Sequence, residues 1–460
     1  MKTIFVTASL PMMIRNIVRS GLLSMIADQA KVVLLCPFSE ESVGKIACHE
    51  NVAIERLPFD RRWLGRLGQF IWLSMQKRRL MKSNVFDRLY FSSKYMRKHY
   101  VWRYFASSVL GSADQFGLVS KLGKQLWQSA WRGNRQFERL FRKYSPSAVW
   151  STHPFLESEW PVLWHAQIRD IPLIASIHSW DNISSRGPLF FPFRKILVWS
   201  DLMKRDIIRS RPLFTHDQIE VVGAPQHDFF QDHSNILSRA DFFRQNGLDP
   251  LRSLILYAGG GSSLPDESVY ISNIISAMED GRLTKPSQIW VRFYGDEAFS
   301  KSLSIVENRQ NVFWERASSE FWGAFRIERD LRDGSDLQHY INLLKWCDVV
   351  VCGPSTVSLD AAILDRPIVN VCYDSEDTRH FWLSIRRLYF ENTHYQQVTT
   401  SGAVRISLDS NELISHINDY LLDPSQENRP RQRLVKKICG DVDGRARSRI
   451  TEAILKTVNN

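Results

Sequence analysis

Two short apolar runs, separated by a polar turn and a helix-forming segment, constrain the fold of this chain more than any other feature. Val349–Cys352 is rich in β-branched residues and stops at the turn Gly353-Pro-Ser-Thr. Small and apolar residues follow, and a second apolar run opens at Pro367. Short apolar runs of this kind are typical of parallel strands buried on both faces. The stretch therefore predicts a strand, a tight turn, a helix and a strand.

The same alternation recurs along the chain in two successive sets. The first set predicts strands at 3–8, 31–36, 52–57, 148–152, 173–177, 196–199 and 220–222. The second predicts strands at 254–257, 289–293, 312–314, 349–352, 368–372 and 404–407. Strands that alternate with helices form doubly wound parallel sheets. We therefore expect an α/β protein with two Rossmann-like domains that face each other across a cleft.

Changes in pattern indicate the domain limits. The N-terminal domain is expected at 1–230, with a long helical insertion at about 60–145. Residues 231–252 are polar and end in a Gly-Leu-Asp-Pro turn, which favours a linker. The second domain is expected at 253–440. The final residues, 441–460, form a basic helix that we expect to pack on the N-terminal domain.

Composition indicates a globular chain, with 44% hydrophobic and 24% charged residues among 460. Six cysteines form no CxxC pair and show no zinc spacing, so we expect a reducing compartment and no metal site. Arg15 and Arg19 interrupt the first apolar run, which favours a strand over a signal peptide. No window offers about 18 uninterrupted apolar residues, so no membrane span is expected.

Positive charge is unevenly distributed in a chain of net charge +11. Residues 61–105 interleave many arginines and lysines with aromatic side chains. This mixture suits an anionic membrane surface or a nucleic acid, and it also fits a helical subdomain with a solvated basic face. We expect a cytoplasmic protein, with peripheral attachment to the inner face of the plasma membrane through 61–105 as one hypothesis and no specific nucleic acid as a partner.

Polar residues after two strands of the second domain predict a nucleotide site. The turn places Ser355 and Thr356 at a helix N-terminus, where N–H groups and the helix dipole favour anions. Asp360 lies about one helical turn further on, where a carboxylate can reach a ribose. The strand at 254–257 opens into a glycine-rich loop that includes Gly260, Gly261, Ser262 and Ser263. Close backbone approach and hydroxyl groups suit a phosphate, although such a loop alone is as often a simple turn.

Arg292 lies inside a strand pattern, where an unpaired charge would be costly. It needs either a carboxylate partner or a ligand phosphate, and the carboxylate is the slightly favoured expectation.

Polar residues also follow two strands of the first domain. His153 ends one strand, with Glu157 and Glu159 beyond it, and His178 and Asp181 end the next. A histidine or carboxylate at this edge can deprotonate an acceptor hydroxyl. We expect Asp181 or His178 to be the base, with His153 and Glu157 as alternatives. The structural interpretation is that Trp180 fills a pocket while Asp181 and Asn182 cap the next segment.

Several of these motifs together carry a resemblance to a known family. Ser179-Trp-Asp-Asn182, Val221-Val-Gly-Ala-Pro-Gln-His-Asp228 and Gly353-Pro-Ser-Thr-Val-Ser-Leu-Asp360 resemble bacterial glycosyltransferases of the GT-B type. The resemblance is nearest to surface-polysaccharide enzymes related to CDP-glycerol glycerophosphotransferases and UDP-N-acetylglucosamine 2-epimerases. It covers roughly residues 145–375.

The resemblance implies a transferase whose N-terminal domain holds an acceptor and whose C-terminal domain holds a nucleotide-activated donor. Ser355, Thr356 and Asp360 match the donor-binding turn, with Asp360 where a glutamate is more usual. Arg292 matches an Arg-x-His-Pro motif whose histidine is missing here. No metal and no cofactor besides the nucleotide-sugar substrate are implied.

These observations favour a glycosyltransferase that moves a sugar to a glycan or lipid-linked acceptor in bacterial surface-polysaccharide biosynthesis. A phosphotransferase that moves a polyol phosphate from a CDP donor, a sugar-nucleotide epimerase and a basic nucleic-acid-binding protein are the alternatives.

Overall fold

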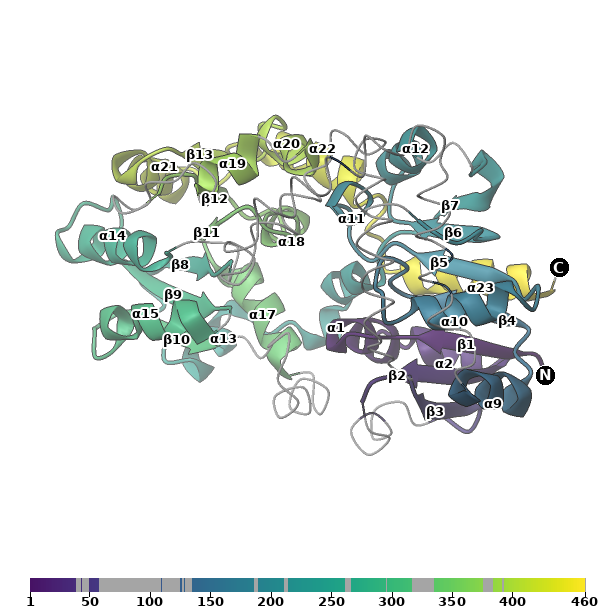
Figure 1. Ribbon diagram of the computed structural model, residues 1–460. Coiled ribbons are helices and arrows are strands. Elements are labelled where there is room, and N and C mark those ends of the chain that lie inside the picture. Colours follow the sequence, from purple (N-terminus) through teal and green to yellow (C-terminus); the bar gives the residue numbers. More distant parts are fainter. Residues whose placement is uncertain are drawn as a thin grey trace. The chain divides into compact units, whose positions relative to one another are not determined.

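The computed structural model describes residues 1–38, 43, 49–57, 109, 125, 128, 135–185, 189–210, 214–260, 266–294, 296–316, 335–374, 384–390 and 393–459. The chain divides into two compact units. Unit 1 comprises Met1–Ala224 and Arg447–Asn460, and unit 2 comprises Pro225–Ala446. Each unit contains one parallel β-sheet with helices packed against it (Figure 1).

The sheet of unit 1 has seven strands in the order β3-β2-β1-β4-β5-β6-β7. Their bounds are β1 (Thr3–Thr7), β2 (Lys31–Cys36), β3 (Val52–Arg56), β4 (Ala148–Ser151), β5 (Leu173–Ser176), β6 (Lys195–Val198) and β7 (Ile219–Val221). Phe5 is level with Val33 on β2 and with Val149 on β4, and all three are fully buried. The sheet is therefore a core layer, as its continuous apolar strands predict.

In the described residues of unit 1, every helix except the C-terminal one lies between two successive strands. They are α1 (Pro11–Ile14), the π-helix η1 (Arg15–Arg19), α2 (Leu22–Ala27), α9 (Arg135–Tyr144), α10 (Trp160–Gln167), α11 (Asn182–Ser185), α12 (Asp201–Ser210), the 3-10 helix η2 (His216–Gln218) and α23 (Ala446–Asn459). The last helix returns to unit 1, where Arg447 donates to the carbonyl of Ser20 and Arg449 to that of Val222, both at 2.9 Å.

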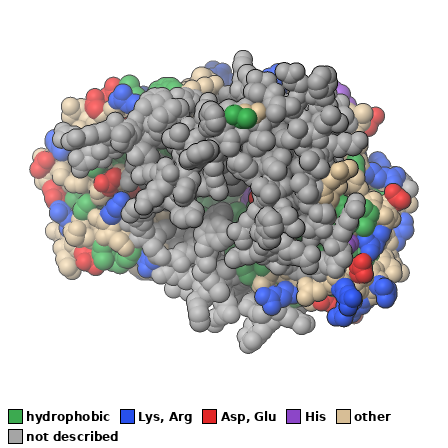
Figure 2. Space-filling view, viewed as in Figure 1, with side chains coloured by type: hydrophobic (Ala, Val, Ile, Leu, Met, Phe, Trp, Pro, Cys, Tyr) green, Lys and Arg blue, Asp and Glu red, His purple; other side chains and the backbone are tan. Residues whose placement is uncertain are grey.

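Helix α9 has one apolar and one basic face. Phe137, Leu140 and Phe141 are buried, because their spacing places them on the side that faces the sheet. The exposed side carries Arg135, Arg139, Arg142 and Lys143. Lys and Arg side chains gather over this part of unit 1 in the space-filling view (Figure 2). The basic segment 61–105 lies outside the described residues.

The sheet of unit 2 has six strands in the order β10-β9-β8-β11-β12-β13. Their bounds are β8 (Ser253–Ala258), β9 (Ser287–Phe293), β10 (Val312–Arg316), β11 (Val349–Cys352), β12 (Ile368–Val371) and β13 (Arg405–Ser407). Every strand expected from the apolar runs is present in one sheet or the other. The prediction of two parallel α/β sheets is confirmed.

Helices cover both faces of the sheet in unit 2. They are α13 (Arg239–Gln245), α14 (Ser268–Glu279), α15 (Asp296–Val306), α17 (Ser335–Trp346), α18 (Val357–Ile363), α19 (Ile385–Phe390), α20 (Thr393–Thr399), α21 (Ser410–Leu422) and α22 (Asn428–Ile438). Helices α14 and α15 lie on one face, and α17 and α18 lie on the other (Figure 1). The short 3-10 helices η3 (Pro225–Gln231) and η4 (His233–Asn235) precede α13.

The chain passes from one unit to the other after Ala224 and again after Ala446. The backbone N–H of Ala446 donates to the carboxylate of Asp228 at 3.1 Å, so the two crossing segments are joined within unit 2. The expected linker, 231–252, contains η4 and α13 and belongs to unit 2.

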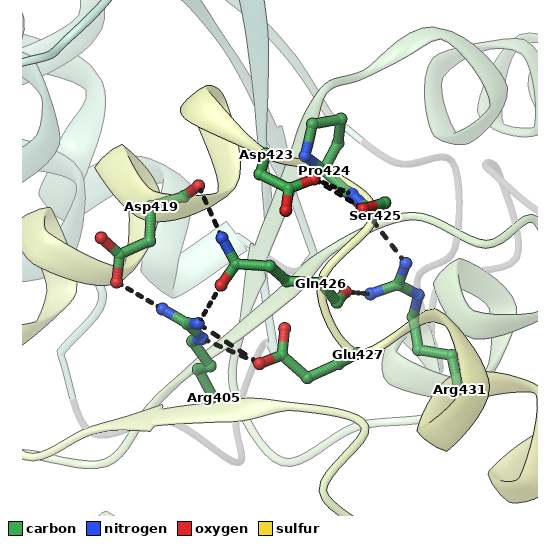
Figure 3. A network of polar contacts seen from close by, with 8 residues as sticks. All are labelled: Arg405, Asp419, Asp423, Pro424, Ser425, Gln426, Glu427 and Arg431. Atoms are coloured by element: carbon green, nitrogen blue, oxygen red, sulfur yellow. Dashed lines mark hydrogen bonds and ion pairs between the residues drawn. The ribbon is translucent and has the colours of Figure 1, made fainter.

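A polar network fastens the end of unit 2 (Figure 3). Arg405 on β13 binds Asp419 of α21 at 2.5 Å and Glu427 at 3.2 Å. The fully buried Arg431 of α22 donates to the carbonyls of Gln426 and Pro424. Its Nε also binds Asp365, at the end of α18, at 2.8 Å. The network therefore holds α22 against α18, which carries Asp360.

In the part of the chain that the structure describes, no helix has both the length and the apolarity to cross a bilayer. The five described cysteines are free and buried.

Candidate functional site

In open parallel sheets, ligands bind beyond the carboxyl ends of the strands, where the strand order reverses. In unit 2 this reversal lies between β8 and β11, and in unit 1 it lies between β1 and β4. The predicted site residues follow β4 and β5 in unit 1 and β8 and β11 in unit 2, and Arg292 lies near the end of β9. Each unit therefore presents its candidate residues beside its own reversal point.

The loop after β8 opens with two glycines held close to neighbouring backbone. The N–H of Gly259 donates to the carbonyl of Arg292 at 2.9 Å. A Cβ on Gly259 would meet that carbonyl oxygen and the nitrogen of Tyr294, both at 3.1 Å. The close approach explains why glycine is needed here. Gly261, Ser262 and Ser263, also predicted for this site, lie outside the described residues.

Glu267 is a buried acid beneath this loop that sequence analysis missed. Its Oε1 accepts hydrogen bonds from the N–H of Gly260 at 2.5 Å and from the hydroxyl of Tyr257 at 3.4 Å. Burial raises the pKa of its carboxyl to about 7, although those two donors oppose the rise. Glu267 therefore holds the backbone of Gly260 from inside the unit.

The turn after β11 places Ser355 and Thr356 as predicted. The N–H of Ser358 donates to the carbonyl of Ser355, and the N–H of Asp360 donates to that of Thr356. Thr356 is exposed, whereas Ser355 and Asp360 are half-buried. Asp360 lies in the first turn of α18, and its Oδ2 accepts a hydrogen bond from the hydroxyl of Tyr340 at 3.0 Å. Its side chain is thus held by a neighbouring helix.

Arg292, on β9, forms ion pairs with two carboxylates. Its Nη1 lies 2.5 Å from Glu315 on β10, and its Nη2 lies 2.8 Å from Asp336 on α17. His339 binds the other oxygen of Glu315 at 3.2 Å. Burial alone would raise the pKa of Glu315, but His339 and Arg292 outweigh burial and lower it to about 2. For Arg292 the sequence left two expectations, a carboxylate partner or a ligand phosphate. The structure shows carboxylate partners.

Helix α17 contributes three side chains that sequence analysis did not consider. Asp336, His339 and Tyr340 share one face of the helix, since they are three and four positions apart. The ring of Tyr340 lies 5.2 Å from the guanidinium of Arg292 while its hydroxyl binds Asp360. A polar face with this spacing, in the helix before a buried strand, was the signal that could have identified these residues.

In unit 1 the structure brings together two of the predicted catalytic residues. The rings of His153 and His178 are stacked with centroids 5.9 Å apart. His153 is buried after β4, and His178 is half-buried after β5. Neighbouring parallel strands end at the same edge, which explains the meeting of two side chains that are far apart in sequence.

Asp181 and Glu157 lie in the loops beside these histidines. The Oδ1 of Asp181 accepts hydrogen bonds from the hydroxyl of Ser179 at 2.5 Å and from the side-chain amide of Asn182 at 3.3 Å. Glu157 is exposed, before α10. Trp180 is buried, and Asp181 directly precedes α11, whose first residue is Asn182.

Glu159, two residues beyond Glu157, is fully buried at the reversal point of unit 1. Its Oε2 accepts hydrogen bonds from the hydroxyls of Thr7 on β1 and Ser151 on β4, both at 2.5 Å. Burial raises the pKa of this carboxyl to about 7, against the effect of its hydroxyl donors. Glu159 joins the ends of the two central strands and is the least exposed acid of this region.

The 3-10 helix η3, which follows β7, contains a buried histidine. Burial lowers the pKa of His227 to about 4, so its imidazole is neutral at physiological pH. It lies just after the crossing from unit 1 to unit 2.

Comparison with protein families gives one match, over residues 323–456, to the family of CDP-glycerol:poly(glycerophosphate) glycerophosphotransferases. The matched segment contains Tyr340, Ser355, Thr356 and Asp360. No curated protein matches the chain in sequence.

Solved structures show the same fold across the chain. A putative UDP-N-acetylglucosamine 2-epimerase from Listeria monocytogenes has a TM-score of 0.58 at 10% identity, covering 100% of this chain and 97% of its own. The UDP-GlcNAc 2-epimerase from Neisseria meningitidis, bound to UDP-GlcNAc, has a TM-score of 0.56 at 9% identity, covering 99% and 100%. A glycosyltransferase from Rickettsia africae has a TM-score of 0.50 at 10% identity, covering 99% of each chain. The expected GT-B class of fold and the expected resemblance are thereby confirmed.

Proposed function

We propose that this chain is a glycosyltransferase that moves a sugar from a nucleotide-activated donor to a glycan or lipid-linked acceptor of a bacterial surface polysaccharide. The observation that carries the proposal is the strand-end site of unit 2. There Gly259, Gly260, Ser355 and Thr356 border the reversal between β8 and β11, and Asp360 is held one turn further on. The family match over the same turn supports a nucleotide-activated donor.

The donor diphosphate would lie against backbone N–H groups and the hydroxyls of Ser355 and Thr356. Negative charge grows on the phosphate as the bond to the sugar breaks, and donors already in place stabilise it without reorganisation. Asp360, fixed by Tyr340, would accept a hydrogen bond from the ribose. The backbone carbonyl of Arg292 accepts a hydrogen bond from Gly259 at 2.9 Å. Its guanidinium pairs with two carboxylates, and direct contact of that group with phosphate stays a prediction.

Unit 1 would supply the acceptor side. Deprotonation of an acceptor hydroxyl requires a base within hydrogen-bond reach. His178 and Asp181 are our candidates, because both follow β5 at the carboxyl edge of the sheet. His153 stacks on His178 and would limit the orientation of its ring.

A second candidate function follows from the family match itself. The family is named for transfer of glycerophosphate from CDP-glycerol, so a polyol phosphate is the alternative group to be moved. In that reaction the bond between the two donor phosphates breaks and CMP leaves. Transfer of a sugar breaks the bond between sugar and diphosphate instead, and a nucleoside diphosphate leaves.

Calorimetric binding of UDP, GDP, ADP, CDP and CMP tests the proposal. We expect one nucleotide to bind selectively, and the Ser355→Ala/Asp360→Ala variant to lose this binding. CMP as the released product with CDP-glycerol would select the phosphotransferase. Turnover of a UDP-sugar without an acceptor would select an epimerase. Failure of every nucleotide to bind would contradict the proposal, and salt-sensitive binding of arbitrary DNA would then favour the nucleic-acid alternative.

Attachment to a membrane is a further part of the proposal. The basic face of α9 follows the basic segment 61–105 in the chain, and clustered cations favour anionic lipid surfaces. Neutralising Arg78, Arg79 and Lys82 should abolish sedimentation with phosphatidylglycerol vesicles. Unchanged sedimentation would contradict a membrane role for the segment.

A further inference from the structure

A closed ring of hydrogen bonds lies directly beneath the turn after β11. It joins the side chains of Ser358 on α18, Asn370 on β12 and Tyr395 on α20. The hydroxyl of Tyr395 donates to Oδ1 of Asn370 at 2.9 Å. The amide of Asn370 donates to the hydroxyl of Ser358 at 3.1 Å, and that hydroxyl lies 3.0 Å from the hydroxyl of Tyr395. Because Tyr395 gives its proton to Asn370, Ser358 is the donor in the third bond.

All three side chains are buried, with exposed fractions of 0% for Ser358 and Asn370 and 2% for Tyr395. Polar groups withdrawn from water must find partners, and a fully satisfied buried ring favours one arrangement over its neighbours. Within the ring, each group donates one hydrogen bond and accepts one. Removing any one of them therefore breaks two of the three bonds of the ring.

The ring reaches both ends of the turn. The amide of Asn370 also lies 3.4 Å from the carbonyl of Cys352 and 3.3 Å from its sulfur, at the last residue of β11. Ser358 is in the first turn of α18, and its N–H donates to the carbonyl of Ser355. The amide of Asn370 therefore connects Cys352, just before the segment Gly353–Thr356, with Ser358, shortly after it.

We propose that Tyr395, together with Asn370 and Ser358, is a positioning residue that holds the Gly353–Thr356 turn in the conformation that binds a nucleotide. The inference rests on the proposed function for its ligand. Tyr395 touches no part of the proposed donor, and it acts through Ser358 and Asn370. Burial raises the pKa of Tyr395, so its hydroxyl stays protonated and remains able to donate to Asn370.

The chain offers a matched control in Tyr389. Its ring packs edge-to-face on that of Tyr395, with centroids 5.3 Å apart, and it is equally buried. The hydroxyl of Tyr389 has no hydrogen-bond partner among the described residues. Tyr395→Phe and Tyr389→Phe therefore remove the same hydroxyl from neighbouring buried tyrosines. Only Tyr395→Phe breaks the ring of hydrogen bonds.

The test compares nucleotide affinity with amide exchange in the two variants. Tyr395→Phe should lower the affinity for the nucleotide selected from the panel roughly tenfold. The loss of hydrogen bonds to buried polar groups costs about as much free energy as that change in affinity. It should also speed hydrogen exchange across residues 353–360. Tyr389→Phe should change neither quantity, and Ser358→Ala should resemble Tyr395→Phe.

The outcomes separate this inference from the proposed function. A lower melting temperature of Tyr395→Phe with unchanged affinity and unchanged exchange at 353–360 would show a merely structural role and overturn the inference. Equal effects of the two tyrosine substitutions would also overturn it. If the wild type binds no nucleotide while Tyr395→Phe alone speeds exchange, the anchoring of the turn is supported and the proposed donor function fails.

Discussion

The hydroxyl of Tyr340, on α17, donates a 3.0 Å hydrogen bond to the carboxylate of Asp360, on α18. The ring of Tyr340 also lies 5.2 Å from the guanidinium of Arg292. A single side chain thus links a buried ion-pair cluster to the residue proposed to bind the ribose. Asp360 is held in place before any ligand arrives, and this reduces the entropy that binding must overcome.

Tyr340→Phe should lower the affinity for the nucleotide that the wild type selects by roughly fivefold. A hydrogen bond to a charged group contributes at least about 1 kcal/mol. Isothermal titration calorimetry measures this change. Tyr144→Phe is the control, since Tyr144 donates at 2.6 Å to Glu55, a carboxylate of unit 1. Equal affinities of wild type and Tyr340→Phe would refute a role for this hydrogen bond in binding.

Arg292→Met should lower the free energy of unfolding by about 3 kcal/mol, because Glu315 and Asp336 would lose their shared partner in a buried setting. Chemical unfolding followed by tryptophan fluorescence measures the loss. Arg309→Met is the matched control, since Arg309 pairs with Glu279 at 2.6 Å while 39% and 51% of the two side chains are exposed. Exposed pairs contribute about 1 kcal/mol or less. Similar losses in both variants would contradict the assignment of Arg292 as a buried anchor.

Glu159 should make stability fall as pH rises. Its pKa is raised from 4.5 to about 7 in the folded protein. Between these values the folded state binds more protons than the unfolded state, so the free energy of unfolding decreases with increasing pH. The full effect of this shift is about 3 kcal/mol. Urea unfolding between pH 5 and pH 8 measures it.

Glu159→Gln should flatten that decline, because the neutral amide loses no proton over this range. Glu157→Gln, in the same loop but exposed, should leave the decline unchanged. An identical pH dependence of wild type and Glu159→Gln would show that the carboxyl does not titrate as described. Glu267 would then be one source of a remaining decline, since burial raises its pKa to about 7 as well.

Arg431→Met should destabilise unit 2 by about 3 kcal/mol. The substitution removes the donor to the carbonyls of Gln426 and Pro424 and one of two donors to the carboxylate of Asp365. Arg433→Met, on the exposed side of the same helix, should change stability by less than about 0.5 kcal/mol. Differential scanning calorimetry distinguishes the two variants. Equal melting temperatures would show that the network in Figure 3 contributes little to holding α22.

The strands were predictable because each is a short apolar run between polar turns. Val349–Cys352 is buried on both faces. A central strand of a parallel sheet buries every side chain of such a short apolar run. The positions of Ser355, Thr356 and Asp360 followed from the same local pattern. His153 and His178 were predictable as a pair because neighbouring parallel strands end at one edge.

The partners of Arg292 were not predictable in the same way. Glu315 is level with Arg292 on the adjacent strand, and Asp336 reaches it from a helix 44 residues away in sequence. Nothing in the local pattern distinguishes a phosphate from either carboxylate. Glu159 was likewise seen only as an acid beyond a strand, and its burial depends on Thr7, which is 152 residues distant.

The sequence by itself thus determined the alternation of strands and helices, the parallel sheets and the loops that carry polar side chains. These properties depend on local periodicity and on the burial of apolar runs. The tertiary structure decided which polar groups satisfy one another, as in the ring of Ser358, Asn370 and Tyr395 and the pairing of Tyr340 with Asp360. Hydrogen bonds and ion pairs act over about 3 Å and depend on direction, so they exist only once packing has brought distant segments together.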